Sequence, residues 1–357
     1  MACKRILSFI LLLSVVFSMP FGVTAAETTP SIVESGTCGT SSRYTLDSQG
    51  TMRITGTGAV NVCLGSSRIT TLIIEDGITS LTSDAFSGSV NLVSVTFPET
   101  LQYMLTDCFA RCKSLKSVYL PDSLTQLGYG AFSECTSLET VRLPAGLTKL
   151  DASVFEDCTS LRNIVLPESL QIIERNAFTN CSSLTSLELP EGITSVGVGA
   201  FRGCTGLTEI TIPSGVTNLP SSVFQDCTSL EEITIDETIA DVTFFAFRNC
   251  TALKRVYYYG TQEQWAQVQI HPNGNEHFLS ATVYCNADVP VTGDFNRDFQ
   301  VTDQDALYIL RHTLFPEVYP AVKNLDVDAN GFVDTADVLY MLRHTFFPDL
   351  YPLYPTA

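Results

Sequence analysis

Oxygen-bearing side chains recur at the same spacing in two short segments near the C-terminus. The first segment spans residues 294–305 and the second spans residues 326–337. Each carries Asp or Asn at its first, third, fifth and twelfth positions: Asp294, Asn296, Asp298 and Asp305, then Asp326, Asp328, Asn330 and Asp337. Alternating side chains of this kind converge on a hard cation, and the residue at position 7 adds its backbone carbonyl. The spacing therefore predicts two calcium-binding loops, with a pair of acidic turns as the alternative.

The two loops differ at the position where the chain must turn sharply. Gly331 fills this position in the second loop, and Asp334 adds an oxygen at position 9. Phe299 stands at the sharp turn of the first loop, where a side chain strains the backbone. Position 12 is Asp in both loops, whereas EF-hand loops usually carry Glu there. We therefore expect two calcium ions, with the first site weaker.

Each loop runs into a near copy of the same apolar segment, DALYILRHTLFP at residues 305–316 and DVLYMLRHTFFP at residues 337–348. These two loop-and-helix repeats resemble the type I dockerin family over about residues 290–357. The resemblance implies a small all-α module that binds Ca²⁺ and docks onto a cohesin module of a scaffoldin, in the cellulosomes of fibre-degrading anaerobic bacteria.

The dockerin resemblance also implies roles for single residues. It places one ion on Asp294, Asn296, Asp298, Gln300 (through its carbonyl) and Asp305, and the other on Asp326, Asp328, Asn330, Phe332 (through its carbonyl) and Asp337. It places the cohesin contacts on Asp303, Gln304, Arg311, His312, Thr335, Ala336, Arg343 and His344. The helix residues match between the repeats, which is compatible with two binding orientations, but the loop residues differ. Arg and His in a last helical turn are alternatively explained as complements of the helix dipole.

A strict repeat precedes this region. Phenylalanines recur every 23 residues, at 86, 109, 132, 155, 178, 201, 224 and 247. Cys follows Phe by three residues in all but the first repeat, and Leu follows by six in every repeat. Two apolar positions then flank one variable residue, as in Val118-Tyr119-Leu120, and Pro follows in most repeats. A fixed period of this length is typical of a solenoid.

The spacing within one repeat predicts its local structure. The alternation indicates a short strand with its apolar side inward, ended by Pro, which lacks an N–H. The three-residue steps of Phe, Cys and Leu indicate a short helix or a 3₁₀ turn facing the core. One unit cannot bury its own apolar face, so we expect about eight stacked coils with one parallel sheet about 35–40 Å long.

The pattern AFxxCxxL…LPxxL resembles the BspA-like leucine-rich repeats of bacterial surface proteins, over about residues 70–260. The resemblance implies an α/β solenoid with a β cap at each end. The expected domains are a signal peptide at 1–26, an N-terminal β cap at 27–68, repeats at 69–259, a C-terminal cap at 260–287 and the dockerin at 288–357.

Variable residues project outward from the predicted strands and form a graded surface that runs from small polar through basic to acidic. We expect a binding face that includes Tyr119, Arg142, Glu188, Glu209, Glu232 and Tyr257. Few aromatic residues lie on it, which favours a protein or mixed partner over a defined glycan. The alternative is a solvated face without a ligand. No nucleophile, base and acid constellation is recognisable, and His271 and His277 lack ligand spacing.

Composition and the N-terminus narrow the function classes. The 357 residues include 38 acidic and 20 basic side chains, a net charge of −18, which argues against nucleic acid as a partner. Lys4 and Arg5 precede an apolar run that ends before the small residues at 24–26, which predicts a secretory signal peptide. A membrane anchor is the alternative, although the run is shorter than a span requires. We therefore expect a secreted, extracellular protein attached to a cellulosome, without a membrane span.

Two functions fit these features. The first is a non-catalytic binding or adhesion protein whose dockerin docks calcium-dependently while the repeat face binds a protein or cell-surface partner. The second is a cellulosomal enzyme subunit, such as a glycoside hydrolase that degrades plant polysaccharide, which would need two carboxylates beside a cleft.

Twelve cysteines are many for a chain of this size, and seven of them follow the 23-residue period. We interpret these seven as small buried apolar side chains with reduced thiols, because parallel side-chain directions on adjacent coils suit a disulfide poorly. Cys38 and Cys63 form the only bridge that the sequence leaves open.

Overall fold

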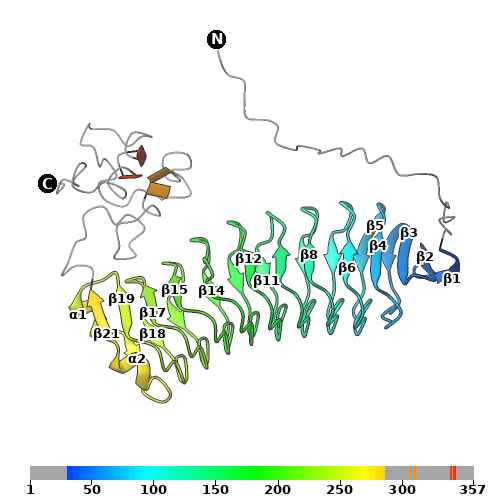
Figure 1. Cartoon of the computed structure of the whole chain (residues 1–357). Coiled ribbons are helices and arrows are strands. Elements are labelled where there is room, and N and C mark those ends of the chain that lie inside the picture. The colour runs from blue at the N-terminus through cyan, green and yellow to red at the C-terminus, as the bar shows by residue number, and fades with distance from the viewer. Residues whose placement is uncertain (1–29, 286–305, 308, 311–337, 340, 343–357) are drawn as a thin grey trace, which may run out of the picture.

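The computed structural model describes residues 30–285 together with 306–307, 309–310, 338–339 and 341–342. Residues 30–285 form an elongated parallel β-solenoid of about 10 coils (Figure 1). This confirms the predicted solenoid, and it exceeds the expected eight coils because the cap also contributes strands. The predicted signal peptide lies outside the described residues.

Three long strands occupy the region predicted as the N-terminal β cap. They are β1 (Ile32–Thr37), β2 (Ser41–Asp47) and β3 (Thr51–Val60), joined as antiparallel pairs. β3 then pairs in parallel with the first strand of each side of the solenoid. The antiparallel strands thereby cover the apolar end of the first coil.

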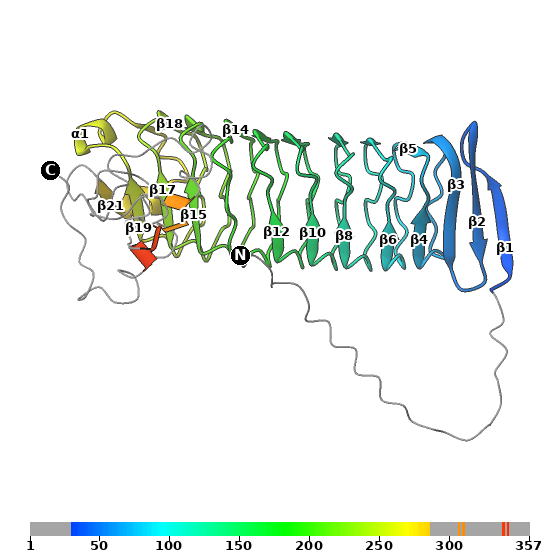
Figure 2. The ribbon, with the colours of Figure 1, turned by 90° about the horizontal axis from the view of Figure 1, so that it is seen from above.

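The coils contribute strands to two ladders on opposite sides of the solenoid (Figure 2). The first, which we call the face ladder, contains β4 (Thr71–Ile74), β6 (Ser94–Thr96), β8 (Ser117–Tyr119), β10 (Thr140–Arg142), β12 (Asn163–Val165), β15 (Glu209–Ile212), β17 (Glu232–Ile235), β19 (Arg255–Tyr258) and β21 (Thr282–Cys285). The second ladder contains β5 (Ile78–Leu81), β7 (Tyr103–Met104), β9 (Gln126–Leu127), β11 (Lys149–Leu150), β13 (Ile172–Ile173), β14 (Ser195–Val196), β16 (Asn218–Leu219), β18 (Asp241–Val242) and β20 (Gln269–Ile270).

The prediction of one continuous parallel sheet was therefore wrong. The face ladder is interrupted between β6 and β8 and again between β12 and β15. The second ladder is interrupted between β9 and β11 and between β14 and β16. The strands are two to four residues long in the repeats, so small changes in the angle between coils are enough to end the pairing.

The segment from each Phe to the following Leu forms consecutive turns. In one coil, Cys135 donates its backbone N–H to the carbonyl of Phe132 at 3.2 Å, and Leu138 donates to Cys135 at 2.9 Å. Bonds of this i→i−3 type close β-turns, and Glu134 within the first turn has a positive φ of 57° that a 3₁₀ turn does not allow. The expected short helix or 3₁₀ turn was therefore wrong in form, because left-handed residues break the segment into separate β-turns, and within residues 30–260 the structure has no helix.

Two positions in each of these turns have a left-handed backbone. They lie two residues before and two residues after Phe, with φ between 53° and 73° in all eight repeats. Asp, Asn, Gly and Ser fill most of them, which are residues that tolerate this conformation. The turn is therefore specified locally by polar residues around the buried Phe.

The core of the solenoid is a stack of phenylalanine rings. Neighbouring ring centroids from Phe86 to Phe247 lie 5.3–6.0 Å apart and the planes differ by at most 21°. All eight side chains are fully buried. Burial of each ring contributes about 1.5–3 kcal/mol, so the stack holds the coils in register.

The C-terminal cap closes this stack. It contains α1 (Gln262–Trp265) and α2 (Glu276–Ser280), and the Phe278 ring stacks on Phe247 at 4.3 Å. The buried Asn275 amide accepts the Phe247 N–H at 2.9 Å and donates to the carbonyl of Thr243. A side chain thus replaces the backbone partner that the next coil would have supplied.

Candidate functional site

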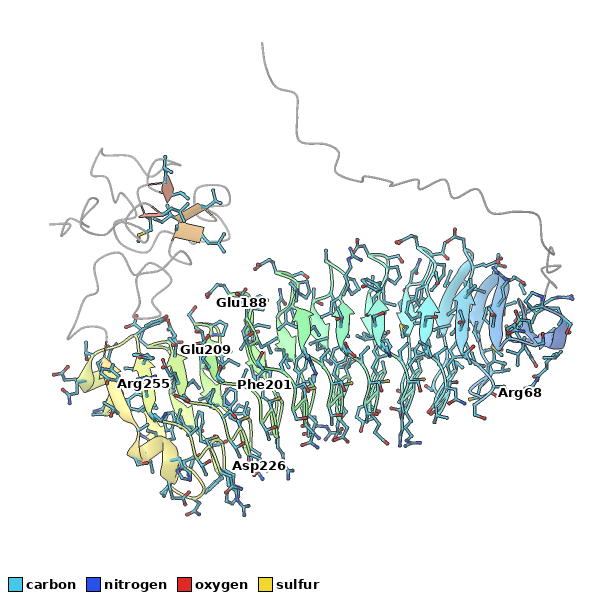
Figure 3. All side chains as sticks on the ribbon, viewed as in Figure 1. Arg68, Glu188, Phe201, Glu209, Asp226 and Arg255 are labelled. Carbon is cyan, nitrogen blue, oxygen red and sulfur yellow. The ribbon has the colours of Figure 1, made fainter. Side chains whose placement is uncertain are left out.

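The six predicted repeat-face residues all project from the side of the solenoid that carries the face ladder. Figure 3 shows Glu188, Glu209 and Arg255 along this side of the solenoid, and Asp226 at the turn edge below them. Tyr119 is 63% exposed, Glu188 and Glu209 are exposed, and Glu232 and Tyr257 are half-buried. The structure therefore places them on one surface, while their binding role stays a prediction.

Tyr119 and Arg142 are direct neighbours, because β8 and β10 pair in register at these residues. The Arg142 guanidinium also donates to the carboxylate of Asp122 at 2.8 Å. This hydrogen bond and a second one from the Ala145 backbone N–H lower the pKa of Asp122. The positive charge that Arg142 was expected to add to the face is therefore compensated by a carboxylate from the preceding coil.

Carboxylates follow on the next coils. Glu209 and Glu232 are paired in register on β15 and β17, so two acids lie on adjacent strands. Glu232 forms an ion pair with Arg255 of β19. The adjacent residues Glu231 and Lys254 form a second pair at 3.0 Å. The acidic half of the face is thus partly compensated toward its C-terminal end.

The cap adds an aromatic residue that was not predicted. β21 extends the face ladder, and Tyr284 lies beside Tyr257 with ring centroids 5.4 Å apart. Tyr284 follows Tyr257 by 27 residues instead of 23. Because of these extra residues in the cap, the 23-residue period does not identify Tyr284 as a face position.

Val165 is another outward residue of the repeat face that the predicted binding set leaves out. It is 82% exposed at the end of β12, although it lies between charged residues of the neighbouring coils. A groove of about 540 Å³ lies on one side of it, toward Arg142, and another of about 370 Å³ lies on the other side, toward Glu188. Its outward position within the repeat was the available signal.

The ladder cysteines are buried free thiols, as predicted. They do more than fill space, since each donates its S–H to the carbonyl of a Phe one coil earlier. Examples are Cys204 to Phe178 at 3.2 Å and Cys227 to Phe201 at 3.1 Å. Burial raises the pKa of Cys204 to about 12, which keeps the thiol neutral and unreactive.

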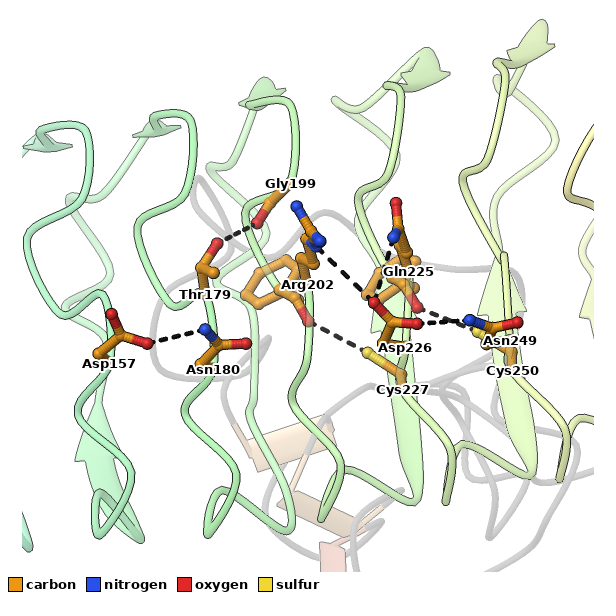
Figure 4. A network of polar contacts seen from close by, with 12 residues as sticks. Asp157, Thr179, Asn180, Gly199, Arg202, Gln225, Asp226, Cys227, Asn249 and Cys250 are labelled. Atoms are coloured by element: carbon orange, nitrogen blue, oxygen red, sulfur yellow. Dashed lines mark hydrogen bonds and ion pairs between the residues drawn. The ribbon is translucent and has the colours of Figure 1, made fainter. Parts of the chain in front are cut away.

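A polar network lines the turn edge beside these thiols (Figure 4). Asp226 accepts from the side-chain amides of Asn249 at 2.7 Å and Gln225 at 3.1 Å, and Arg202 lies 3.7 Å away. Asn180 donates to Asp157 at 2.7 Å in the same way. These contacts join adjacent coils along their exposed edge, so we assign them to stability.

Cys38 and Cys63 form no bridge: both are free, the first buried and the second exposed.

All predicted calcium-ligating and cohesin-binding residues lie outside the described residues. The described residues that follow the two loops, 306–307, 309–310, 338–339 and 341–342, are helical, and Ala306, Ile309 and Met341 among them are buried. This agrees with a helix after each loop. In the part of the chain that the structure describes, no cluster of three or more His, Cys, Asp or Glu side chains could hold a metal ion.

The geometry defines a class of protein: a capped repeat solenoid whose coils keep one interior and vary one outer face. The family follows from a match of six copies of the BspA-type leucine-rich repeat region to residues 60–185 and 171–267. These matches span more than half of the chain, so the chain belongs to the BspA-type leucine-rich repeat family. A type I dockerin domain matches residues 292–344.

Similar solved structures are bacterial. A leucine-rich repeat protein from Bacteroides ovatus is 23% identical and covers 69% of this chain and 77% of that chain, with a TM-score of 0.47. A leucine-rich repeat protein from T. pallidum is 27% identical and covers 59% of this chain and 86% of that chain, with a TM-score of 0.39. No curated protein sequence matches the chain.

The helices in the described part of the chain are α1 and α2 in the cap and the short helical stretches after residue 305. None of these helices is long and apolar enough to cross a membrane.

Proposed function

We propose that this protein is an exported, non-catalytic adaptor of the cellulosome, which docks onto a scaffoldin cohesin through its C-terminal region and binds a second partner on its repeat face. The match of residues 292–344 to a type I dockerin carries the docking half of the proposal. The exposed variable face on an invariant core supports the binding half. The apolar run before residue 26 supports export to the cell surface.

The donor chemistry of the two loops fits calcium. Each offers side-chain carboxylates and an amide oxygen at alternating positions, and Ca²⁺ prefers six to eight such oxygens. Asp294, Asn296, Asp298, Gln300 and Asp305 would hold the first ion. Asp326, Asp328, Asn330, Phe332 and Asp337 would hold the second. When bound, the ions order the loops, so the docking surface is complete only in the calcium form.

Cohesin contacts fall on two matching groups in this proposal. Arg311 and His312 follow the first loop, and Arg343 and His344 follow the second. Asp303 and Gln304 in one loop correspond to Thr335 and Ala336 in the other, so the two groups differ in charge next to the ions. One of the two orientations is therefore favoured for a given cohesin.

Calorimetric titration of the full chain with Ca²⁺ tests the site assignment. Two ions should bind, and Asp305→Ala and Asp337→Ala should each remove one. The site removed by Asp305→Ala should be the weaker, because Phe299 lies in its loop. Absence of calcium binding, or two ions in both variants, would refute the assignment. Hydrolysis of a plant cell-wall glycan by the purified chain would instead favour an enzyme subunit.

A further inference from the structure

The second interruption of the face ladder differs from the others. Residues 186–189, which we call the gap segment, lie where a strand would join β12 to β15, yet no strand forms there. None of its backbone groups makes a hydrogen bond to the described part of either neighbouring coil. At the interruption between β6 and β8, by contrast, each strand is bonded to another neighbour.

The coils remain joined behind the gap segment. Thr194 donates its N–H to the carbonyl of Gln171 at 2.9 Å on the second ladder, and Phe155 donates to Ala177 at 2.9 Å on the turn side. On the face side, Arg162 donates to Glu139 at 3.1 Å, but the corresponding bond from the next coil to Arg162 is absent among the described residues. Between these coils the backbone hydrogen bonds are therefore missing on the face side only, which leaves the donors and acceptors of the gap segment without a backbone partner among the described residues.

The opening reaches apolar side chains of the core. Ile164 and Leu189 occupy inward positions but are only partly buried, whereas the equivalent Val118 and Ile235 are fully buried. Ile164, Leu187 and Leu189 line the groove of about 370 Å³ between β12 and the gap segment. An apolar side chain that entered this groove would continue the core, as a strand residue does elsewhere in the ladder.

The outer rim of the same groove is acidic. Glu168, Glu188 and Glu191 line it, with Arg162 as the one described cation in the lining. Glu209 lies on the face of the following coil. A ligand that fits the groove would therefore carry positive charge outward and apolar groups inward.

We infer that the gap segment and the facing edge of β12 bind an extended peptide in which apolar and basic residues alternate. Its backbone bonds the unpaired groups, its apolar side chains enter the groove and its basic side chains reach the glutamates. Binding by strand addition takes affinity from the main chain and specificity from alternate side chains. This inference rests on the proposed binding role of the repeat face and names the chemistry of its partner.

Fluorescence anisotropy with the full chain tests the inference. The probe is a fluorescein-labelled octapeptide of alternating valine and lysine, capped at both ends. We expect saturable binding, and no binding of the matching valine and glutamate peptide. N-methylation of alternate peptide bonds in the probe should raise the Kd at least tenfold, because it removes main-chain donors without changing charge. Equal affinity of the methylated probe would overturn strand addition.

Matched variants locate the site. Glu168→Gln with Glu188→Gln should raise the Kd at least tenfold. The control double variant, Glu99→Gln with Glu237→Gln, removes the same number of carboxylates. Both of its residues lie 69 residues from Glu168 and therefore occupy the same position of the repeat. The control double variant should bind the probe with the Kd of the parent protein. An equal loss of affinity in both double variants would contradict the proposed location of the site.

The same protein sample should be captured on an immobilised type I cohesin. Failure of the probe with intact cohesin capture refutes this inference alone. Failure of cohesin capture with intact probe binding refutes the docking proposal alone.

Discussion

The buried thiols should make the solenoid sensitive to mildly alkaline pH. Burial raises the pKa of the ladder cysteines, to about 12 for Cys112, Cys204 and Cys250. In the unfolded chain a thiol has a pKa of about 8.5. The unfolded state therefore binds fewer protons above this value, and stability falls with rising pH until the folded thiols ionise. The stabilising effect is complete below the unfolded pKa.

The size of this effect follows from the two pKa values. Between pH 7 and pH 9, each thiol lowers the free energy of unfolding by about 0.8 kcal/mol, and seven thiols lower it by about 6 kcal/mol. That is a large part of the about 5–15 kcal/mol that stabilises a typical domain. Urea unfolding followed by circular dichroism, in a phosphine reductant, measures it at both pH values.

A single substitution isolates one thiol. Cys204→Ala should reduce the loss between pH 7 and pH 9 by about 0.8 kcal/mol relative to the parent. It should also lower stability at pH 7 by about 0.5–1.5 kcal/mol, since the Phe178 carbonyl loses one donor and keeps the Cys181 N–H. Cys63→Ala, which removes an exposed thiol, should follow the parent. An unfolding free energy that is the same at pH 7 and pH 9 would refute the reasoning.

Three further predictions concern packing, charge and the cap. Phe178→Ala, between the rings of Phe155 and Phe201, should cost about 3–5 kcal/mol in urea unfolding, whereas the exposed Phe244→Ala should cost much less. Arg142→Ala should raise the pKa of Asp122 measured by NMR, and an unchanged pKa would show that the pair does not form. Asn275→Ala should speed hydrogen exchange at the Phe247 amide, and the exposed Asn273→Ala should not. Protection equal in both Asn variants would contradict the capping role.

The repeat made most of the interior predictable. Phe, Cys and Leu at fixed steps mark the buried positions, because a solenoid presents the same site to its interior in every coil. The thiol bonds to the Phe carbonyls were not predictable, since they join residues 26 apart and depend on the depth of each coil. The Asn275 cap was missed for a similar reason, as it acts on a residue 28 positions earlier.

The gap segment shows where local pattern stops being informative. Leu187 and Leu189 fit the inward positions of a strand as well as Ile210 and Ile212 do, yet only the second pair lies in one. Strand pairing depends on the twist between neighbouring coils. This twist adds up along the solenoid and cannot be inferred from the sequence of any single repeat. The calcium and cohesin residues rest on their spacing and on the family match, because they lie outside the described residues.

Binding of the full chain to immobilised type I cohesins, measured by surface plasmon resonance with Ca²⁺ and then with EGTA, tests the adaptor proposal most directly. The proposal predicts saturable binding in calcium, its loss in EGTA and its return when calcium is restored. Arg311→Ala with His312→Ala, combined with Arg343→Ala and His344→Ala, should abolish it while calcium binding persists. Binding that EGTA leaves unchanged, or no binding to any type I cohesin in calcium, would contradict the proposal.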